Sequence, residues 1–197
     1  MKKSSILILI IICLVGCKKG SNETTITGEI KGLGTDTLYL YGMDELYDRI
    51  DTIYVENDKF SYTTSVDTIT SAYLLLKNRI EYPVFLDKGN KIKIKGDTIN
   101  LNFLTISGNI YNEEFTDFQK ALEDPADPSE KAGEETVDKR TTVEKANTAE
   151  EMAEEFILQH HSSYVSLYLL DKYFVQKETP DFSKIKKPVS YTHLTLP

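Results

Sequence analysis

Residues 49–64 read Arg-Ile-Asp-Thr-Ile-Tyr-Val-Glu-Asn-Asp-Lys-Phe-Ser-Tyr-Thr-Thr, the clearest local structural signal in the chain. Side chains of different character alternate along the segments on either side of Asn57 and Asp58. Such alternation is typical of β-strands, whose successive side chains point to opposite faces. Asn57 and Asp58 both tolerate the positive φ angles that a tight turn requires. This stretch therefore predicts a β-hairpin.

The same kind of pattern continues in both directions over residues 24–108. Residues 91–95 alternate lysine with isoleucine, as in a strand with one buried face and one wet face. Residues 72–76 are continuously apolar, and Pro83 suits an edge strand or a strand start. We therefore expect a mainly β domain, an antiparallel sandwich or partly closed barrel of about eight short strands.

Helical periodicity replaces the strand pattern after Gly108. Residues 109–123 are predicted to form one helix, with Asn109 or Asn112 as its cap. Residues 124–148 are charged and are expected to be a linker, either mobile or helical and solvated. Residues 149–175 are predicted to form a helical extension, which Ser162 or Ser163 would divide. The expected class is α+β, with two or three helices after the sheet.

The amino terminus has the pattern of a bacterial export signal. Lys2 and Lys3 precede an apolar run over residues 6–15. Ten residues would span about 15 Å as a helix, half the hydrocarbon thickness of a bilayer, so the run suits a signal peptide better than a membrane span. Leu14-Val15-Gly16-Cys17 resembles the lipobox of bacterial lipoproteins. The alternative, a lone cysteine in an ordinary strand, would require all these features to coincide by chance.

The lipobox resemblance implies a lipid anchor. Residues 1–16 would be the signal peptide, the cut would fall between Gly16 and Cys17, and Cys17 would carry the lipid. Residues 17–23 would then be a lipidated tether. More than one acyl chain is needed for stable anchoring. We expect the protein to reside in the cell envelope, facing the periplasm, with its membrane partner either the inner or the outer membrane.

Composition restricts the chemistry and the partners of the chain. Its 197 residues carry a formal net charge of −8, and loss of Lys2 and Lys3 would make the mature chain more negative by two. An acidic balance argues against nucleic acid, and against adhesion to anionic lipid by charge alone. The only cysteines are Cys13 and Cys17. Cleavage removes the first and acylation consumes the second, so thiol–disulfide exchange is excluded for the mature chain.

No residue pattern predicts a catalytic, cofactor or metal site. His160 and His161 are adjacent, and adjacent helical residues diverge, which makes a poor chelate. A helix-end position explains them more simply. Several acidic groups lack the spacing of a calcium loop or of an acid–base pair and are interpreted as solvated charges. These groups are Asp44, Glu45, Asp48 and Asp51, and the pairs Glu134-Glu135, Glu150-Glu151 and Glu154-Glu155.

Tyrosine is frequent in the predicted strands. An aromatic face can stack against sugars or peptides, but half-buried sheet tyrosines are the commoner explanation. The residues concerned are Tyr39, Tyr41, Tyr47, Tyr54, Tyr62, Tyr73 and Tyr82.

The layout over residues 24–122 resembles a domain of unknown function found in Gram-negative lipoproteins. That domain commonly precedes a thioredoxin-like domain of the AhpC/TSA (TlpA- or ResA-like) thiol:disulfide oxidoreductases. Asp58 stands where the family usually has glycine. The residues that carry the likeness are Ile26-Thr27-Gly28-Glu29-Ile30, Leu38-Tyr39-Leu40, Asp51-Thr52, residues 55–62, residues 85–92 and Ile106-Ser107-Gly108-Asn109.

The resemblance implies an accessory domain without catalytic residues of its own, because the family's Cys-x-x-Cys lies in the later domain. We expect the chain to be a fragment that stops before that domain. Residues 176–197 are expected to be disordered, and residues 188–197 resemble a non-native tail produced when a gene model runs into adapter sequence. The preferred interpretation is a lipid-anchored, non-catalytic module of an oxidoreductase. The alternative is a stand-alone glycan- or peptide-binding lipoprotein.

Overall fold

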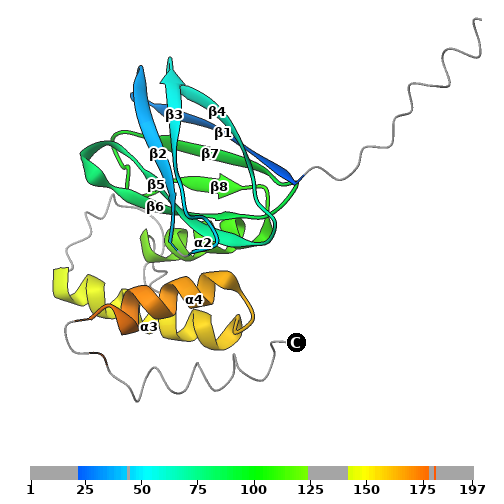
Figure 1. Ribbon diagram of the computed structural model, residues 1–197. Coiled ribbons are helices and arrows are strands. Elements are labelled where there is room, and N and C mark those ends of the chain that lie inside the picture. Colours follow the sequence, from blue (N-terminus) through cyan, green and yellow to red (C-terminus); the bar gives the residue numbers. More distant parts are fainter. Residues whose placement is uncertain (1–21, 44, 124–141, 178–179, 181–197) are drawn as a thin grey trace, which may run out of the picture.

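The computed structural model describes residues 22–43, 45–123, 142–177 and 180. Eight strands form one sheet that curls into a nearly closed barrel, and helices cover one side of it (Figure 1). This confirms the predicted mainly β class with helices. The strands are β1 (Glu23–Lys31), β2 (Asp36–Gly42), β3 (Ile50–Glu56), β4 (Lys59–Ser65), β5 (Thr70–Leu75), β6 (Glu81–Leu86), β7 (Lys91–Asp97) and β8 (Thr105–Ser107), with a 3₁₀ turn η1 (Lys77–Arg79).

The strand order is β6-β5-β2-β3-β4-β1-β7-β8. Every neighbouring pair is antiparallel except β1 and β7, which run parallel with Thr25 beside Lys91 and Glu29 beside Lys95. The sheet is therefore mixed, although an antiparallel one was expected. The parallel pair places the first residues of β1 and β7 at the same end of the barrel.

Three local predictions for the strands are confirmed: the hairpin turn, the alternation of β7 and the edge position of Pro83. Asn57 and Asp58 have φ angles of 51° and 69°, as the hairpin requires. Ile92 and Ile94 of β7 are buried, while the lysines that alternate with them, Lys91, Lys93 and Lys95, are exposed. Pro83 lies in β6, an edge strand of the sheet, where a missing N–H is tolerated.

The last strand is shorter than the sequence suggested. The apolar residues Leu101, Phe103 and Ile106 predict one last strand, but β8 begins at Thr105. Leu101 is nevertheless buried, in the loop that leads into β8. Its apolar character therefore reports burial of a loop and not strand pairing.

Helices follow the sheet: α2 (Ile110–Glu123), α3 (Thr142–Gln159), α4 (Tyr164–Leu170) and the π-helical turn η2 (Asp171–Val175). Asn109 caps α2, because its Oδ1 accepts the Asn112 N–H at 2.9 Å. Ser163, one of the two predicted caps, accepts the Val165 N–H at 3.1 Å. Helical spacing predicts that Ile110 lies on the apolar face of α2 with Phe115 and Phe118, but Ile110 is 58% exposed. The start of α3 falls within residues 124–148, the segment assigned to a linker; residues 124–141 lie outside the described residues.

Helix α2 closes the barrel by bonding to the backbones of both edge strands. The Asn112 amide accepts the Phe85 N–H at 3.0 Å and donates to the Phe85 carbonyl at 2.8 Å. One turn later, the Thr116 hydroxyl accepts the Ile106 N–H and donates to the Ile106 carbonyl, both at 3.0 Å. Unpaired buried backbone groups are costly. These two side chains supply the hydrogen bonds that a further strand between β6 and β8 would otherwise make.

An aromatic layer joins the helices to the barrel. The Tyr168 ring of α4 meets the rings of Phe85 and Phe115 edge-on, with centroids 6.3 and 5.3 Å away. Phe118 of α2 contacts Phe156 of α3 in the same manner at 5.7 Å. Edge-to-face pairs of this kind contribute about 0.5–1.5 kcal/mol each beyond their buried area. The described helices therefore share one hydrophobic core with β6.

Candidate functional site

The predicted lipidation residue lies outside the described residues. Gly16 and Cys17 precede Asn22, where the described chain begins, so the lipid anchor remains a prediction. Within the described residues, no helix combines the length and the apolar character needed to cross a membrane.

The structure divides the seven strand and loop tyrosines into an inner and an outer set. Tyr47 and Tyr82 are buried, and Tyr62 of β4 points the same way as the buried Phe60 and Thr64. Tyr82 bridges the two edges of the sheet: its hydroxyl donates to the Leu104 carbonyl at 2.8 Å and accepts the Leu104 N–H at 3.1 Å. Burial raises the pKa of Tyr82 above its ordinary value. The inner set is therefore structural.

The outer set lies on neighbouring strands of the sheet. Tyr39 and Tyr41 of β2, Tyr54 of β3 and Tyr73 of β5 alternate with buried residues, and the strand order β5-β2-β3 places them on one surface. Together with Ile50 they form what we call the outer tyrosine surface. Tyr54 and Ile50 are 72% and 73% exposed, and Tyr39 is 41% exposed.

One part of the outer tyrosine surface is more ordered than the rest. Tyr41 and Tyr73 have ring centroids 5.8 Å apart, and the Tyr41 hydroxyl donates to the Glu81 carboxylate. Burial and this hydrogen bond raise the pKa of Tyr41. On β3, Ile50 lies beside Tyr41, Tyr54 lies beside Thr37 farther along the strand, and both Ile50 and Tyr54 protrude into solvent. The surface could stack flat apolar faces of a sugar or a peptide, which is the chemistry that the sequence suggested for these tyrosines.

A polar cluster fills the gap between β3 and β4. The two strands pair only at Val55–Phe60 and Glu56–Lys59, next to the turn, and then diverge. In the gap the Tyr47 hydroxyl donates to Asp51 and lies 3.1 Å from the Thr64 hydroxyl.

Arg49 completes the cluster. It pairs with Asp51 at 3.2 Å and donates to the Ser65 carbonyl at 2.9 Å, and its guanidinium lies 4.6 Å from the centroid of the Tyr47 ring. Burial and the hydrogen bond to Asp51 raise the pKa of Tyr47 to about 12. A phenol with this pKa is protonated at ordinary pH, and its contacts with Asp51 of β3 and Thr64 of β4 link the two strands.

The described members of the acidic group considered for calcium do not converge. Asp44 lies outside the described residues, Glu45 and Asp48 are exposed, and Asp51 is engaged with Tyr47 and Arg49. In residues 22–43, 45–123 and 142–177, no group of three or more His, Cys, Asp or Glu side chains could hold a metal ion.

The histidine pair lies at the carboxyl end of α3. The His160 ring stacks on Phe156 with centroids 4.2 Å apart, and its Nδ1 lies 3.2 Å from the Phe156 carbonyl. His160 therefore completes the end of the helix, the position that the sequence suggested for it.

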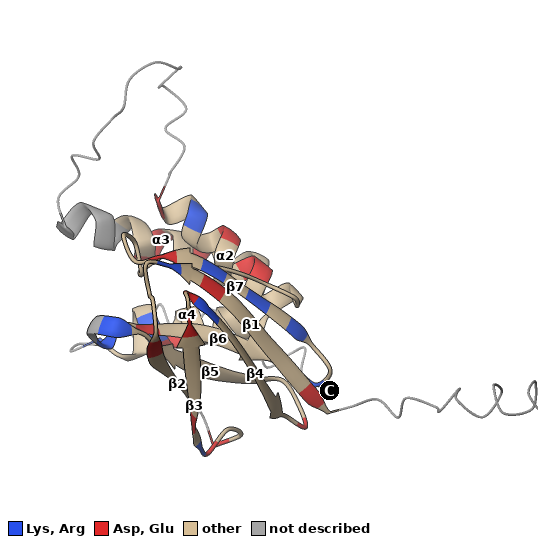
Figure 2. Ribbon diagram, turned by 90° about the horizontal axis from the view of Figure 1, so that it is seen from above, with Lys and Arg blue, Asp and Glu red and all other residues tan. Residues whose placement is uncertain are grey.

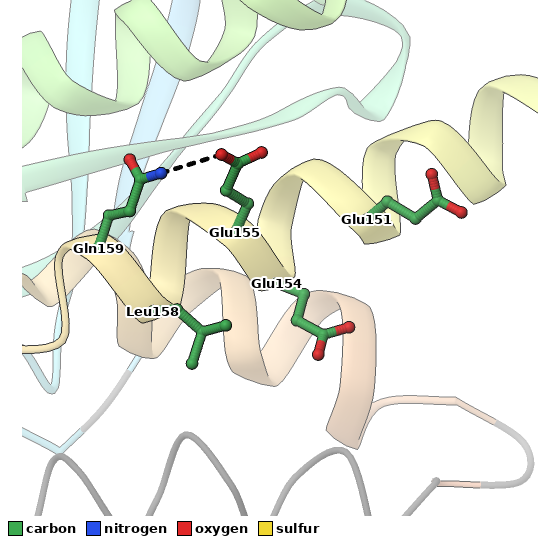
Figure 3. A pocket seen from close by; sticks show the side chains of 5 residues that line it. All are labelled: Glu151, Glu154, Glu155, Leu158 and Gln159. Atoms are coloured by element: carbon green, nitrogen blue, oxygen red, sulfur yellow. Dashed lines mark hydrogen bonds between the residues drawn. The ribbon is translucent and has the colours of Figure 1, made fainter.

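A shallow open depression on α3 is lined by acidic side chains (Figure 3). Glu154 and Leu158 project to one side of the helix, while Glu155 accepts a hydrogen bond from Gln159 at 2.9 Å on another. Glu150, by contrast, pairs with Lys177. Carboxylates that point in different directions on a solvated helix cannot share a proton and cannot bind one substrate together. The described glutamates are therefore interpreted as surface charges, and Glu134 and Glu135 lie outside the described residues.

The polar contacts of Asn112 and Thr116 were missed by the sequence analysis. Asn112 was considered only as a helix cap. One sequence signal could have revealed the pair. Asn112 and Thr116 are polar residues four positions apart, so they lie on the same face of the helix as the apolar Phe115. Polar side chains on a buried face need hydrogen-bond partners.

Comparison with known proteins identifies the β-domain without assigning an activity. Residues 24–115 match the model of a family described as Domain of unknown function (DUF4369). The match runs from β1 into the first half of α2 and includes all eight strands. No curated protein and no solved structure matches the chain. The predicted domain of unknown function is thereby confirmed, whereas its link to lipoproteins and to a thioredoxin-like domain stays a prediction.

Proposed function

We propose that the chain is a lipid-anchored, extracytoplasmic, non-catalytic module that positions a thioredoxin-like thiol:disulfide oxidoreductase domain in the cell envelope. The observation that carries the proposal is the lipobox at residues 14–17, which lies immediately before the matched domain at residues 24–115. Only five residues separate Cys17 from the start of β1. Such a short tether would hold the barrel close to the membrane surface.

The path of the chain supports a positioning role. The described chain enters at β1 on one side of the barrel and leaves η2 on the other side, from the helical layer (Figure 1). The aromatic contacts of Tyr168 with Phe85 and Phe115 fix that layer to the barrel. Any domain joined after η2 would therefore follow from the helical layer and not from the strand next to the proposed anchor.

Mass spectrometry of the membrane fraction tests the anchor. We expect an acylated Cys17 at the new amino terminus, and a Cys17→Ala variant that keeps the unprocessed Met1 and carries no lipid. An unmodified Met1 terminus on the unaltered protein would overturn the proposal. Sequencing the locus beyond codon 187 tests the second part: an in-frame Cys-x-x-Cys domain supports the positioning role, and a native stop codon contradicts it.

A second function is favoured by the exposed part of the outer tyrosine surface. Tyr54, Ile50 and Tyr39 leave apolar area in solvent on adjacent strands, and such area commonly marks a binding surface. A stand-alone lipoprotein could bind a glycan or an extended peptide there. The protein is titrated with oligosaccharides and with peptides while the NMR signals of its tyrosine rings are recorded. We expect the signals of Tyr54 and Tyr39 to shift and that of the buried Tyr82 to stay unchanged. Shifts confined to other residues would exclude this surface.

A further inference from the structure

The outer face of β4, β1 and β7 carries a group of lysines that we call the lysine face: Lys59 of β4 and Lys91, Lys93 and Lys95 of β7. All four side chains are exposed. Figure 2 shows the lysines of β7 as a row of blue along that strand. Alternate residues of a strand lie about 6.6 Å apart, so the row presents three ammonium groups in a line.

The surroundings of Lys91 and Lys93 are hydroxyl-rich, because the register places Thr25 and Thr27 of β1 beside them. Carboxylates lie near the other two lysines. Glu29 is beside both Lys95 and Lys59, Glu56 of β3 is across from Lys59, and Asp97 follows Lys95 in β7. None of the four lysines forms an ion pair with another residue in the described part of the chain. The face is therefore locally positive on a protein whose formal net charge is −8.

The lysine face begins at the end of the barrel that would be anchored. β1 and β7 run parallel, so Lys91 lies beside Thr25, the third residue of β1. Residues 18–22 separate Cys17 from β1, and five extended residues span at most about 17 Å. Lys91 is thus the lysine of the row nearest to the tether, and Lys95 lies farther along the same face.

We propose that the lysine face lies against an anionic phospholipid surface and sets the orientation of the barrel on the membrane. This inference rests on the proposed acylation of Cys17. A few lysines attract anionic lipid only weakly and within a Debye length. The acyl anchor supplies a high effective concentration, so a weak attraction is sufficient to select one orientation of a tethered domain. The lysine face therefore has only to orient the barrel, because the acyl anchor already holds the protein at the membrane.

Amine footprinting of the intact acylated protein tests the orientation. The protein is reconstituted into vesicles of phosphatidylcholine, or of phosphatidylcholine with one third phosphatidylglycerol, and labelled with a membrane-impermeant amine reagent. Peptide mass spectrometry then measures the extent of labelling at each lysine. We expect labelling of Lys91, Lys93 and Lys95 to fall at least about threefold on the anionic vesicles and to recover in high salt. Lys120, on α2, should label equally on both vesicles.

Two variants sharpen the test. In the triple variant Lys91→Gln, Lys93→Gln, Lys95→Gln, the remaining Lys59 should lose its protection on anionic vesicles. In the matched control Lys120→Gln, protection of Lys59 should persist. These substitutions lie on exposed residues, so we expect both proteins to fold normally.

The outcomes separate this inference from the proposal on which it rests. Equal labelling on both vesicles, with the protein acylated and vesicle-bound, would overturn the orientation and leave the anchor intact. A protein that carries no acyl group and stays off the vesicles would overturn the anchor and the orientation together. Protection by an added anionic polysaccharide, without any by phosphatidylglycerol, would assign the face to that polymer and refute the membrane contact.

Discussion

Asn112 illustrates how one buried side chain can complete a sheet. Its amide satisfies both the N–H and the carbonyl of Phe85 on an edge strand. The amide is buried, with only 1% of the residue exposed, so water cannot replace these bonds. A residue of another shape at this position would leave the Phe85 N–H unpaired, while the Phe85 carbonyl would keep the hydrogen bond that Asn109 donates to it at 2.8 Å.

We expect Asn112→Ala to lower the free energy of unfolding by about 1–3 kcal/mol, the cost of leaving one buried polar group unsatisfied. Urea denaturation measures the loss, and hydrogen exchange should show faster exchange of the Phe85 amide. Asn102→Ala, in an exposed loop, is the matched control and should change stability by less than about 0.5 kcal/mol. Equal stability of the two variants would refute the bridging role of Asn112.

Tyr47 links stability to pH. Its pKa is raised to about 12 in the folded protein, whereas an unfolded tyrosine ionises near pH 10. The folded state therefore holds the phenol proton more tightly. The resulting stabilisation is complete below about pH 10 and is lost as the pH rises through about 12.

We expect Tyr47→Phe to cost about 1 kcal/mol near neutral pH, through loss of the hydrogen bonds to Asp51 and Thr64. It should also make the fall of stability above about pH 10 shallower, because one titrating group is removed. Urea midpoints measured across this pH range test both effects. Tyr54→Phe, on an exposed ring, is the control near neutral pH. An unchanged slope in Tyr47→Phe would show that Tyr47 does not titrate as the buried cluster requires.

At the scale of elements, β1 and β4 fit together through a glycine. Gly28 pairs with Phe60, and the Phe60 ring covers the space that a side chain at Gly28 would occupy. A Cβ atom at Gly28 would lie 2.1 Å from the Phe60 Cζ atom. The ring is almost fully buried and has little freedom to move aside.

We expect Gly28→Ala to lower the free energy of unfolding by about 1–3 kcal/mol, the usual cost of overpacking. The double variant Gly28→Ala, Phe60→Leu should be less destabilised than the sum of the single variants, since the smaller side chain makes room. A double-mutant cycle by urea denaturation measures this coupling, which we expect to exceed about 0.5 kcal/mol. Additive costs would mean that the ring and the new methyl group do not compete for space.

Elements with a strong local pattern were predicted correctly from the sequence. The turn at Asn57 and Asp58 and the alternation of β7 both follow from residues that are neighbours in the chain. The parallel pairing of β1 with β7 was not predicted, because it joins segments more than sixty residues apart. The buried loop around Leu101 was misread for the same reason: apolar character reports burial, and the partner that buries the residue is remote in sequence.

At the scale of the whole molecule, net charge conceals how charge is distributed. The acidic total argued against contact with anionic lipid. The sheet, however, gathers Lys59 with Lys91, Lys93 and Lys95 on one face, while acidic side chains lie along α3. The alternation of β7 could predict that its lysines share a face. Only the strand order shows that β1 and β4 add so few carboxylates to it.

The outer tyrosine surface has the same origin. The sequence could identify seven tyrosines but could not decide which of them meet. Tyr39 and Tyr54 come together because β2 pairs with β3, whereas Tyr82 is turned inward on an edge strand. The lipid anchor is the opposite case, since it depends on a short linear motif and requires no tertiary information.

Barrel and helical layer share one core, and this predicts that they unfold together. Tyr168 of α4 is 6% exposed and packs edge-on against Phe85 of β6 and Phe115 of α2. We expect Tyr168→Ala to lower the free energy of unfolding by about 3 kcal/mol, as for other large aromatic truncations. Because the contact joins layers, hydrogen exchange should accelerate in β6 and α2 as well as in α4.

The neighbouring Leu167→Ala is the matched control for that experiment. Leu167 lies in the same helix but is 50% exposed, so its truncation does not open the core. Leucine and alanine have similar helix propensities, so the substitution has little effect on the helix itself. We expect a loss of less than about 1 kcal/mol and an unchanged exchange pattern in β6. If Tyr168→Ala accelerated exchange only within α3, α4 and η2, the helices would be a separate folding unit. They could then not hold a following domain at a fixed place relative to the barrel, and the positioning role would lose its structural basis.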